Sequence, residues 1–233
     1  MRLVMLDTET TGLRVEEGHR LIEIGCIECI DRRVTERVFH TYLNPEREVD
    51  EGATQVHGLT LDQLRDKPRF EAVVDAFLEF VRDAHLVIHN AEFDRGFLNS
   101  ELKRLGRTPL ESHVSSIIDS LAQARERHPG QRNSLDALCQ RYSISNDHRV
   151  LHGALLDARL LADVYMAMTR GQESLAMAAD DDLEADPSFA IDPTMIVVRR
   201  ASDQERAAHE AILQEIDKVS GGQTVWRQQH SNA

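Results

Sequence analysis

Residues 5–13 read Met5-Leu6-Asp7-Thr8-Glu9-Thr10-Thr11-Gly12-Leu13, so two carboxylates one residue apart close an apolar run. Two later segments also place an acidic residue where an apolar run ends or a helix begins: His89-Asn90-Ala91-Glu92-Phe93-Asp94 and His152-Gly153-Ala154-Leu155-Leu156-Asp157. Positions of this kind can converge at one edge of a sheet. Four carboxylates and a histidine gathered there predict a site for divalent metal ions and for the activation of water.

The bulk composition fits one well-buried domain with an additional segment. The chain has 233 residues, of which 41% are apolar, as in an ordinary globular protein. No stretch of the sequence approaches the roughly 18 uninterrupted apolar residues that a membrane span needs. A charge follows the apolar residues 3–6 too soon for a signal peptide. We therefore expect a cytoplasmic protein.

The three cysteines argue against a disulfide framework, because their number is odd and no signal peptide precedes them. Cys26 and Cys29 have the spacing of a metal or redox pair. They lie, however, inside the apolar segment 21–30, which we expect to be a strand. Residues three apart on a strand point to opposite faces, so we interpret both as ordinary strand residues.

The charge of −13 is unevenly distributed along the chain. Residues 171–233 carry 5 basic and 12 acidic side chains, a net charge of −7 over about a quarter of the length. Such an acidic chain has no broad basic surface that could hold nucleic acid by neutralising phosphates. Any action on DNA or RNA would therefore depend on bound metals and on a partner protein.

Alternating strands and helices are expected over residues 1–171. Leu21–Ile30 and Val34–Leu43 flank the polar residues 31–33 and predict a hairpin with a three-residue connection. Apolar residues at helical spacing predict a core-facing helix over 70–81. Further strands are expected at 2–6, 86–88 and 114–118, and helices from Thr60, from Asp94, and at about 119–128, 134–142 and 154–169. This order predicts an α/β fold, with helices on the faces of a mixed sheet.

The C-terminal part predicts a flexible tail. Gly171 closes the domain, and residues 178–194 hold six acidic residues and two prolines, as in a flexible linker. A helix-like segment follows from about Asp203 to Val219, and beyond it lies the only tryptophan, Trp226. That helix would carry a narrow apolar stripe of Ala207, Ala211, Ile212, Ile216 and Val219. Because the segment is too short for a core of its own, we expect it to dock on another surface.

Asp7 and Glu9 would point to the same side of an extended backbone. Two carboxylates held together repel each other unless a cation lies between them, and Mg²⁺ or Mn²⁺ suits oxygen ligands. Asp94 near a helix start and Asp157 on a helix would complete a cage of four carboxylates. Two metal ions roughly 3.5–4 Å apart in such a cage could stabilise the attacking and leaving oxygens of a phosphoryl displacement.

His152 is the candidate proton acceptor of this site. It precedes Asp157 by five residues, about 140° around an ideal helix, so the two cannot project alike from one regular helix. We therefore expect His152 on the loop before the helix, close to the water that attacks. The ordinary pKa of histidine, near 6.5, suits proton transfer at neutral pH.

Each of these residues also has an ordinary interpretation when it is taken alone. An Asp-x-Glu pair at a strand end is common, and His152 could be a surface residue. Asp94 could cap a helix, and Asp157 could be a solvated helix residue. The five residues together, in this order along the chain and with these neighbouring residues, favour a catalytic site.

The three motifs together resemble those of the DEDD-type 3′–5′ exonucleases, in the branch that carries a histidine. This resemblance implies a ribonuclease-H-like exonuclease fold, two Mg²⁺ or Mn²⁺ ions and release of nucleoside monophosphates from a 3′ end. It also implies roles for the motif residues. The metal ligands would be Asp7, Glu9, Asp94 and Asp157, the general base His152, and the substrate contacts Val56 and His57 with Asp7, Glu9 and Asp157.

Further segments resemble the epsilon-subunit family of bacterial DNA polymerase III, the replicative proofreading exonucleases. They are Asn133–Cys139, Ala208–Ala211 and the Gly221-Gly222…Trp226 pattern, and the resemblance covers nearly the whole chain. It implies that segment 195–233 binds the polymerase alpha subunit and that the substrate is the 3′ end of a single-stranded or frayed DNA primer. It leaves open whether a small stabilising subunit also binds.

Gln172–Met177 resembles a sliding-clamp-binding peptide, in which a glutamine and spaced apolar residues enter a pocket. Met177 stands where an aromatic residue is often found, so the contact would be weak. The alternative is a helix end that runs into the linker. The expected organisation is therefore an exonuclease domain at 1–171, a clamp peptide at 172–177, a linker at 178–194 and a polymerase-binding segment at 195–233.

Two alternative functions remain at this point. An RNA-trimming 3′–5′ exoribonuclease would use the same site, but such relatives usually act without a polymerase. A non-catalytic subunit that bridges clamp and polymerase would not need the motif carboxylates and His152.

Overall fold

The computed structural model of the chain describes residues 1–146, 151–170 and 201–220. The chain divides into two units, Met1–Ala178 and Ala179–Ala233, and each is described here by itself. The expected boundary at 171, the clamp peptide, the linker and the residues around Trp226 lie outside the described residues.

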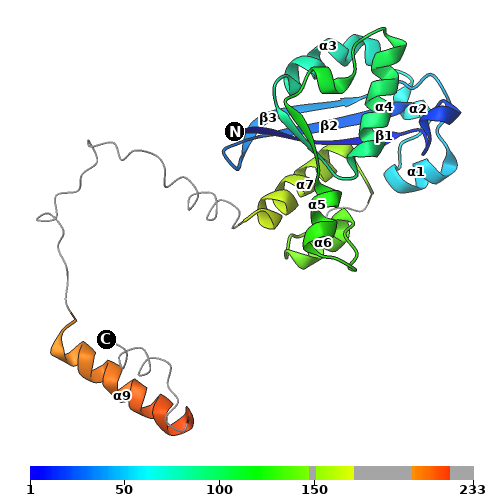
Figure 1. The fold of residues 1–233 in the computed structure, drawn as a ribbon. Coiled ribbons are helices and arrows are strands. Elements are labelled where there is room, and N and C mark those ends of the chain that lie inside the picture. Colours follow the sequence, from blue (N-terminus) through cyan, green and yellow to red (C-terminus); the bar gives the residue numbers. More distant parts are fainter. Residues whose placement is uncertain (147–150, 171–200, 221–233) are drawn as a thin grey trace, which may run out of the picture. The chain divides into compact units, whose positions relative to one another are not determined.

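The first unit is built on one sheet of five strands in the order β3-β2-β1-β4-β5 (Figure 1). The hairpin strands β2 and β3 are antiparallel to their neighbours, whereas β1, β4 and β5 run parallel. The strands are β1 (Arg2–Thr10), β2 (Leu21–Ile30), β3 (Arg33–Tyr42), β4 (His85–Ile88) and β5 (Ser116–Asp119). This arrangement confirms the expected mixed sheet.

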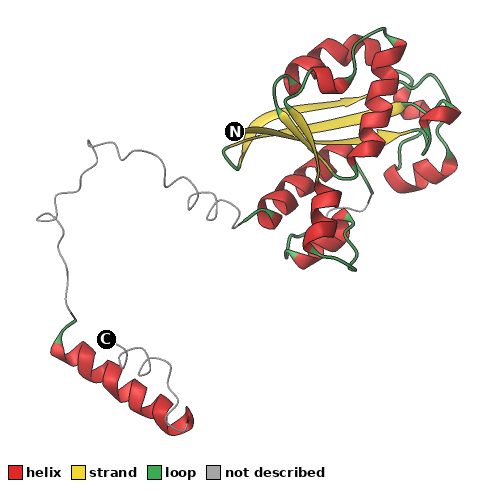
Figure 2. Cartoon of the chain, viewed as in Figure 1, coloured by secondary structure: helices red, strands yellow, loops and turns green. Residues whose placement is uncertain are grey.

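Helices cover both faces of this sheet (Figure 2). The longer ones are α3 (Phe70–Val81), α4 (Ala91–Arg104) and α7 (Ala154–Met168). The shorter ones are α1 (Glu51–His57), α2 (Leu61–Leu64), α5 (Ser120–Arg127) and α6 (Leu135–Arg141), with the 3-10 turns η1 (Val15–Glu17) and η2 (Leu110–Ser112). Helix α2 follows Thr60, as expected, and a capping box of Thr60 and Gln63 closes its N-terminus.

Strand β1 supplies both halves of the core because its side chains alternate between the two faces. Val4 and Leu6 are buried in the cluster that includes residues of α3 and α4. Leu3 and Met5 are buried in the cluster that includes residues of α5, α6 and α7. Complete burial of one such side chain stabilises the fold by about 1.5–3 kcal/mol. The same alternation continues beyond Leu6 and decides where the polar residues of β1 point.

Gly25 allows α7 to lie directly against β2. A Cβ atom at this position would come within 2.4 Å of the backbone of Ala154 and Leu155, at the N-terminus of the helix. Gly25 also pairs with Asp7 on the neighbouring strand. The missing side chain therefore brings the first turn of α7 next to the acidic end of β1.

Several local expectations differ from the structure, and one of them is the start of α4, which begins at Ala91 and not at Asp94. The hairpin connection has two residues, Asp31 and Arg32, instead of three, and both have positive φ angles of 47° and 63°. Positive φ at both central residues is the mark of a type I′ turn, which matches the twist of a hairpin. Strand β1 extends to Thr10, so both carboxylates lie on the strand. Helix α1 was not expected, because its sequence has no helical apolar period.

Cys26 and Cys29 lie in β2 and belong to different core clusters, on opposite faces of the sheet. The structure describes all three cysteines, and none of them forms a disulfide. The interpretation of Cys26 and Cys29 as strand residues is thus confirmed.

The described part of the second unit contains helix α9 (Asp203–Ser220), where the sequence predicted a helix. The apolar stripe on it is exposed: Val219 is 91%, Ile212 58% and Ile216 42% accessible. Among the residues that the structure describes, no helix has the length and apolar character needed to cross a bilayer.

Candidate active site

A cavity of about 340 Å³ lies where β1, α4 and α7 meet, and we call it the carboxylate cavity. It brings together all five residues that the sequence singled out for chemistry. Its wall is formed by Asp7, Thr8, Glu9, His89, Phe93, Asp94, Leu121, Ser134, Leu135, Asp136, His152 and Asp157.

The four carboxylates reach this cavity from three elements. Asp7 and Glu9 lie on β1, where the alternation places them on the α7 side of the sheet. Asp94 lies in the first turn of α4 and Asp157 in the first turn of α7. Glu9 is 9% exposed, and Asp94 and Asp157 are each 3% exposed. Charged groups buried this deeply are costly unless they are paired or bind a cation.

Asp94 is held by Thr8, whose side chain points to the face of the sheet opposite that of Asp7 and Glu9. The hydroxyl of Thr8 donates a hydrogen bond of 2.7 Å to Asp94 Oδ1. Burial raises the pKa of Asp94 to about 7, although hydrogen bonds from Thr8 act against this rise and the nearby charge of Asp119 adds to it. A cation beside this carboxyl group would favour its charged form.

His152 lies on the loop before α7, as its spacing to Asp157 predicted. Its backbone N–H donates to the carbonyl of Val56 over 3.1 Å, which ties this loop to the end of α1. Its Nδ1 lies 3.5 Å from Asp157 Oδ2, and its side chain is 44% exposed. Ligand atoms of Glu9, His152 and Asp157 all lie within 4.8 Å of one another.

The donor set of the carboxylate cavity fits a hard divalent cation. Carboxylate oxygens are the ligands that Mg²⁺ and Mn²⁺ prefer, and this cavity collects five such groups, the four predicted ones and Asp136. The proximity of His152 to Glu9 and Asp157 also puts an imidazole beside the place where a water molecule would be held. The arrangement can therefore support hydrolysis assisted by metal ions.

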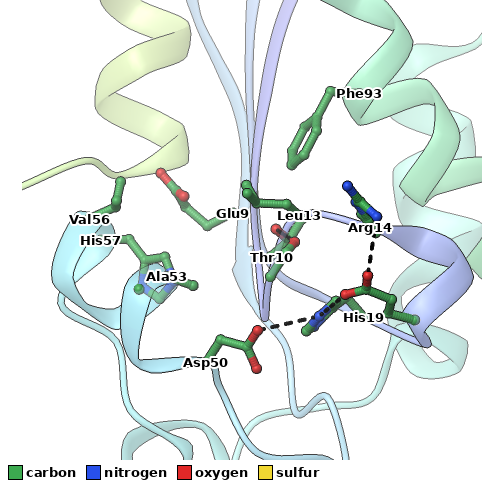
Figure 3. Close-up of a pocket in the computed structure, with 13 residues that line it drawn as sticks. Glu9, Thr10, Leu13, Arg14, His19, Asp50, Ala53, Val56, His57 and Phe93 are labelled. Atoms are coloured by element: carbon green, nitrogen blue, oxygen red, sulfur yellow. Dashed lines mark hydrogen bonds and ion pairs between the residues drawn. The ribbon is translucent and has the colours of Figure 1, made fainter.

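A second cavity of about 530 Å³ adjoins the first and shares Glu9 and Phe93 with it (Figure 3). We call it the larger cavity. Val56 and His57 lie on one side of it, on α1, and Leu13 and Arg14 lie on the other side. Its remaining wall consists of Thr10, Gly12, Glu17, His19, Asp50, Gly52 and Ala53.

His57 is the last residue of α1 and is only 5% exposed, so it is not an ordinary loop residue. Its Nδ1 accepts a 3.0 Å hydrogen bond from the backbone N–H of Leu59, which leaves the proton on Nε2. Nε2 is buried and has no hydrogen-bond partner among the described residues. Burial lowers the pKa of His57, although the backbone of Thr10 acts against this change, and the neighbouring His152 lowers the pKa further.

Several wall residues were not singled out from the sequence. Phe93 stands within a quoted motif, and its place one residue before Asp94 in α4 could have indicated a role. Thr8 lies between the two strand carboxylates and could have been expected to reach the opposite face. His19 carried no sequence signal, because its contacts come from segments distant in the chain.

Comparisons with known proteins agree with this geometry. The exonuclease family model matches residues 4–165. The chain is 48% identical to the DNA polymerase III subunit epsilon of Escherichia coli (strain K12) over 239 residues, with 97% of each chain covered.

Two solved structures share the fold at lower sequence identity. The first is exonuclease X in complex with 5′-overhanging duplex DNA. It aligns with a TM-score of 0.56 and 24% identity over 72% of this chain and 90% of that one. The second is the nuclease domain of 3′hExo, a DEDDh family member bound to rAMP. Its TM-score is 0.61 with 17% identity, over 72% and 90% of the two chains.

Proposed function

The chain belongs to the exonuclease family and, within it, to the epsilon subunits of DNA polymerase III, and from this premise we propose its function. It is a 3′–5′ exonuclease that proofreads for the replicative DNA polymerase. It removes mispaired nucleotides from the 3′ end of a growing DNA strand and releases nucleoside monophosphates.

One observation carries this proposal. Four carboxylates from three elements far apart in the sequence, together with His152, line one cavity of about 340 Å³. A structural role does not explain this arrangement, because like charges at this depth destabilise a fold. Hydrolysis of a phosphodiester does explain it.

We assign the metal ligands to Asp7, Glu9, Asp94 and Asp157, and expect two ions, Mg²⁺ or Mn²⁺. When bound, such ions lower the pKa of water and stabilise the attacking and leaving oxygens of an in-line displacement. Thr8 orients Asp94 through its 2.7 Å hydrogen bond, and the first turn of α7 holds Asp157 against β1. These contacts fix the carboxylates before a substrate arrives.

We assign the general base to His152. Its ring lies beside Glu9 and Asp157, and its exposure leaves room for a proton to pass on to solvent. As the attacking water loses a proton, an imidazole nitrogen accepts it, and the nearby carboxylate of Asp157 stabilises the resulting imidazolium. The leaving 3′ oxygen departs with the shortened strand.

The larger cavity is proposed to receive the 3′-terminal nucleotide. Val56 is 45% exposed on its wall and offers an apolar contact, whereas the buried Nε2–H of His57 offers a donor. The shared residue Glu9, with Asp7 and Asp157, would contact the substrate at its reacting end. A nucleotide seated in this way would place its phosphate at the carboxylate cavity.

Partner proteins would explain how an acidic chain obtains DNA. We propose that segment 195–233 binds the polymerase alpha subunit and that Gln172–Met177 binds the sliding clamp, with residues 178–194 as a flexible linker between them. The exonuclease domain is then 1–171. A small stabilising subunit could bind as well. Assembly with a polymerase implies that the protein works in the cytoplasm.

The direct test is digestion of a 5′-labelled DNA primer on a template by the purified chain in Mg²⁺. Stepwise shortening, faster from a mispaired than from a paired 3′ end and abolished by a chelator, is the expected result. A higher rate on a matched RNA strand would indicate the RNA-trimming alternative. No shortening in Mg²⁺ or in Mn²⁺ would favour the non-catalytic bridging subunit.

A further inference from the structure

His19 is a buried histidine in the wall of the larger cavity that the proposed reaction does not use. Its side chain is 4% exposed, although its neighbours Glu17 and Asp50 are more than half exposed. In Figure 3, His19 lies on the side of the cavity opposite Val56 and His57. A histidine buried at this place needs polar partners, and the structure supplies three of them.

The two ring nitrogens of His19 have different polar partners. Nδ1 lies 3.0 Å from the hydroxyl oxygen of Thr11, which itself accepts a 3.0 Å hydrogen bond from the backbone N–H of Arg20. Because carboxylates only accept hydrogen bonds, the two that face Nε2 favour a hydrogen on that nitrogen, and the Thr11 hydroxyl is then placed to donate to Nδ1. Nε2 faces two carboxylates, Asp50 Oδ2 at 3.4 Å and Glu17 Oε2 at 3.6 Å.

These contacts join three separate parts of the cavity wall. Thr11 belongs to the loop that follows β1, Glu17 belongs to η1, and Asp50 is the residue before α1. The backbone N–H of Asp50 also donates a 3.0 Å hydrogen bond to the carbonyl of Thr11, so the backbone joins the same two segments. Because α1 begins at Glu51 and ends at His57, a link to Asp50 also fixes the helix that carries the proposed substrate contacts.

Gly12 shows how tightly the loop is fitted over this ring. A Cβ atom on Gly12 would lie 2.3 to 2.6 Å from three atoms of the His19 imidazole. Gly12 does not have a positive φ angle, so the contact with His19 and not the backbone conformation requires glycine here. The ring therefore supports the loop that carries Leu13 and Arg14.

We propose that His19 is a positioning residue that sets the width of the larger cavity. It holds the loop Thr10–Arg14 at a fixed distance from α1, and so shapes the seat of the 3′-terminal nucleotide. This inference rests on the proposed function and deepens it, because it assigns affinity for the terminal nucleotide to a wall residue that takes no part in the proposed reaction. Loss of His19 should weaken substrate binding and leave the chemistry intact.

The test measures kcat and KM of the full chain on a 5′-labelled primer with a mispaired 3′ end in Mg²⁺. His19→Leu removes both hydrogen-bonding nitrogens and should raise KM about tenfold, the effect of losing about 1.4 kcal/mol of binding. The change in kcat should stay within about twofold, because the carboxylate cavity is unaltered. His19→Gln, whose amide can still reach a carboxylate, should restore part of the affinity.

The matched control is His113→Leu. His113 also shares a hydrogen bond with a threonine, Thr108, over 2.9 Å, but it lines neither cavity. This variant should keep the wild-type KM. A thermal melt of each variant would show whether the protein is folded, and His19→Gln provides the test if His19→Leu does not fold.

A second test uses the close contact with Gly12. Gly12→Ala should raise KM in the wild-type chain, where the new methyl group meets the ring, but should have no further effect in His19→Ala. Equal effects of Gly12→Ala in both backgrounds would overturn the proposal. So would a wild-type KM in His19→Leu with a reduced kcat, since that result indicates a role in folding alone.

The proposed function and the positioning role of His19 can fail separately. If the wild-type chain shortens the primer and the His19 variants keep its KM, only the positioning role is wrong. If the wild-type chain does not shorten it under any metal condition, the proposed function is wrong and the positioning role falls with it.

Discussion

The carboxylate cavity and the larger cavity share Glu9 and Phe93 but differ in most other respects. The first is lined by buried acids, with Asp94 and Asp157 at 3% exposure, and it has a volume of about 340 Å³. The second is wider, about 530 Å³, and is lined on α1 by Ala53, Val56 and His57. The difference suggests a division of work, with the chemistry in the acidic cavity and recognition of the terminal nucleotide in the other.

Changes in the carboxylate cavity should therefore lower kcat. Asp157→Ala, and likewise Asp7→Ala, should reduce kcat by at least about 10³-fold, which corresponds to about 4 kcal/mol of transition-state stabilisation. The fold should remain, because removal of a buried charge from a cluster of like charges relieves repulsion. Primer digestion together with circular dichroism would check this, and retained turnover in either variant would remove the site assignment.

His152→Ala should have the next largest effect. Loss of a general base reduces the rate by about 10²–10⁴-fold, and KM should change little because the larger cavity is intact. Single-turnover rates measured at several pH values would test the role. A near-normal rate would exclude His152 as the base.

Thr8→Val should act on the same cavity more weakly. The substitution keeps the shape of the side chain and removes the hydrogen bond to Asp94. Loss of a residue that orients a metal ligand costs about 10–100-fold in metal affinity or activity. Activity titrated against Mg²⁺ should show a raised requirement for the metal. A wild-type titration curve would mean that Asp94 is oriented without Thr8.

Val56→Ala should change recognition instead of chemistry. Removing apolar surface from the wall of the larger cavity should raise KM about fivefold, the effect of roughly 1 kcal/mol of contact. Val38→Ala is the matched control, because Val38 is similarly exposed, at 43% against 45%, and lines neither cavity. A fall in kcat with unchanged KM would contradict the division between the two cavities.

Glu28→Gln should affect neither cavity and should alter only stability. Burial alone would raise the pKa of Glu28, but hydrogen bonds from Arg2 and Thr35 and the charge of Arg37 hold it below its ordinary value. A carboxyl group with a lowered pKa stabilises the fold above its unfolded pKa, and this contribution disappears as the pH falls through the folded pKa. Melting curves should show a deficit of about 5 °C at pH 7 that shrinks as the pH falls below the ordinary pKa of glutamate and closes below the folded pKa. A deficit that is independent of pH would contradict this account.

Much of the fold could be predicted from the sequence, because apolar residues recur at the spacing of a strand or a helix in most of its elements. The apolar run 86–88, the amphipathic helix 70–81 and the long helix from Ala154 all appear where they were expected. The two-residue turn at Asp31 and Arg32 was missed, because Arg32 stands where such a turn usually has glycine. Helix α1 was missed since Glu51–His57 has no apolar stripe.

In the candidate site too, some features could be predicted from the sequence and others could not. The convergence of Asp7, Glu9, Asp94 and Asp157 could be inferred, because each lies at the end of a strand or the start of a helix. The partners that hold them could not. The hydrogen bond from Thr8 to Asp94 joins residues 86 apart, and the contacts of His19 with Thr11 and Asp50 depend on how three loops meet.

The most direct test of the central claim is a comparison of kcat and KM for Asp157→Ala and Val56→Ala on one primer with a mispaired 3′ end in Mg²⁺. We expect Asp157→Ala to lose kcat almost completely, and Val56→Ala to keep kcat while its KM rises. Equal losses of kcat in both variants, or activity retained in Asp157→Ala, would contradict the account.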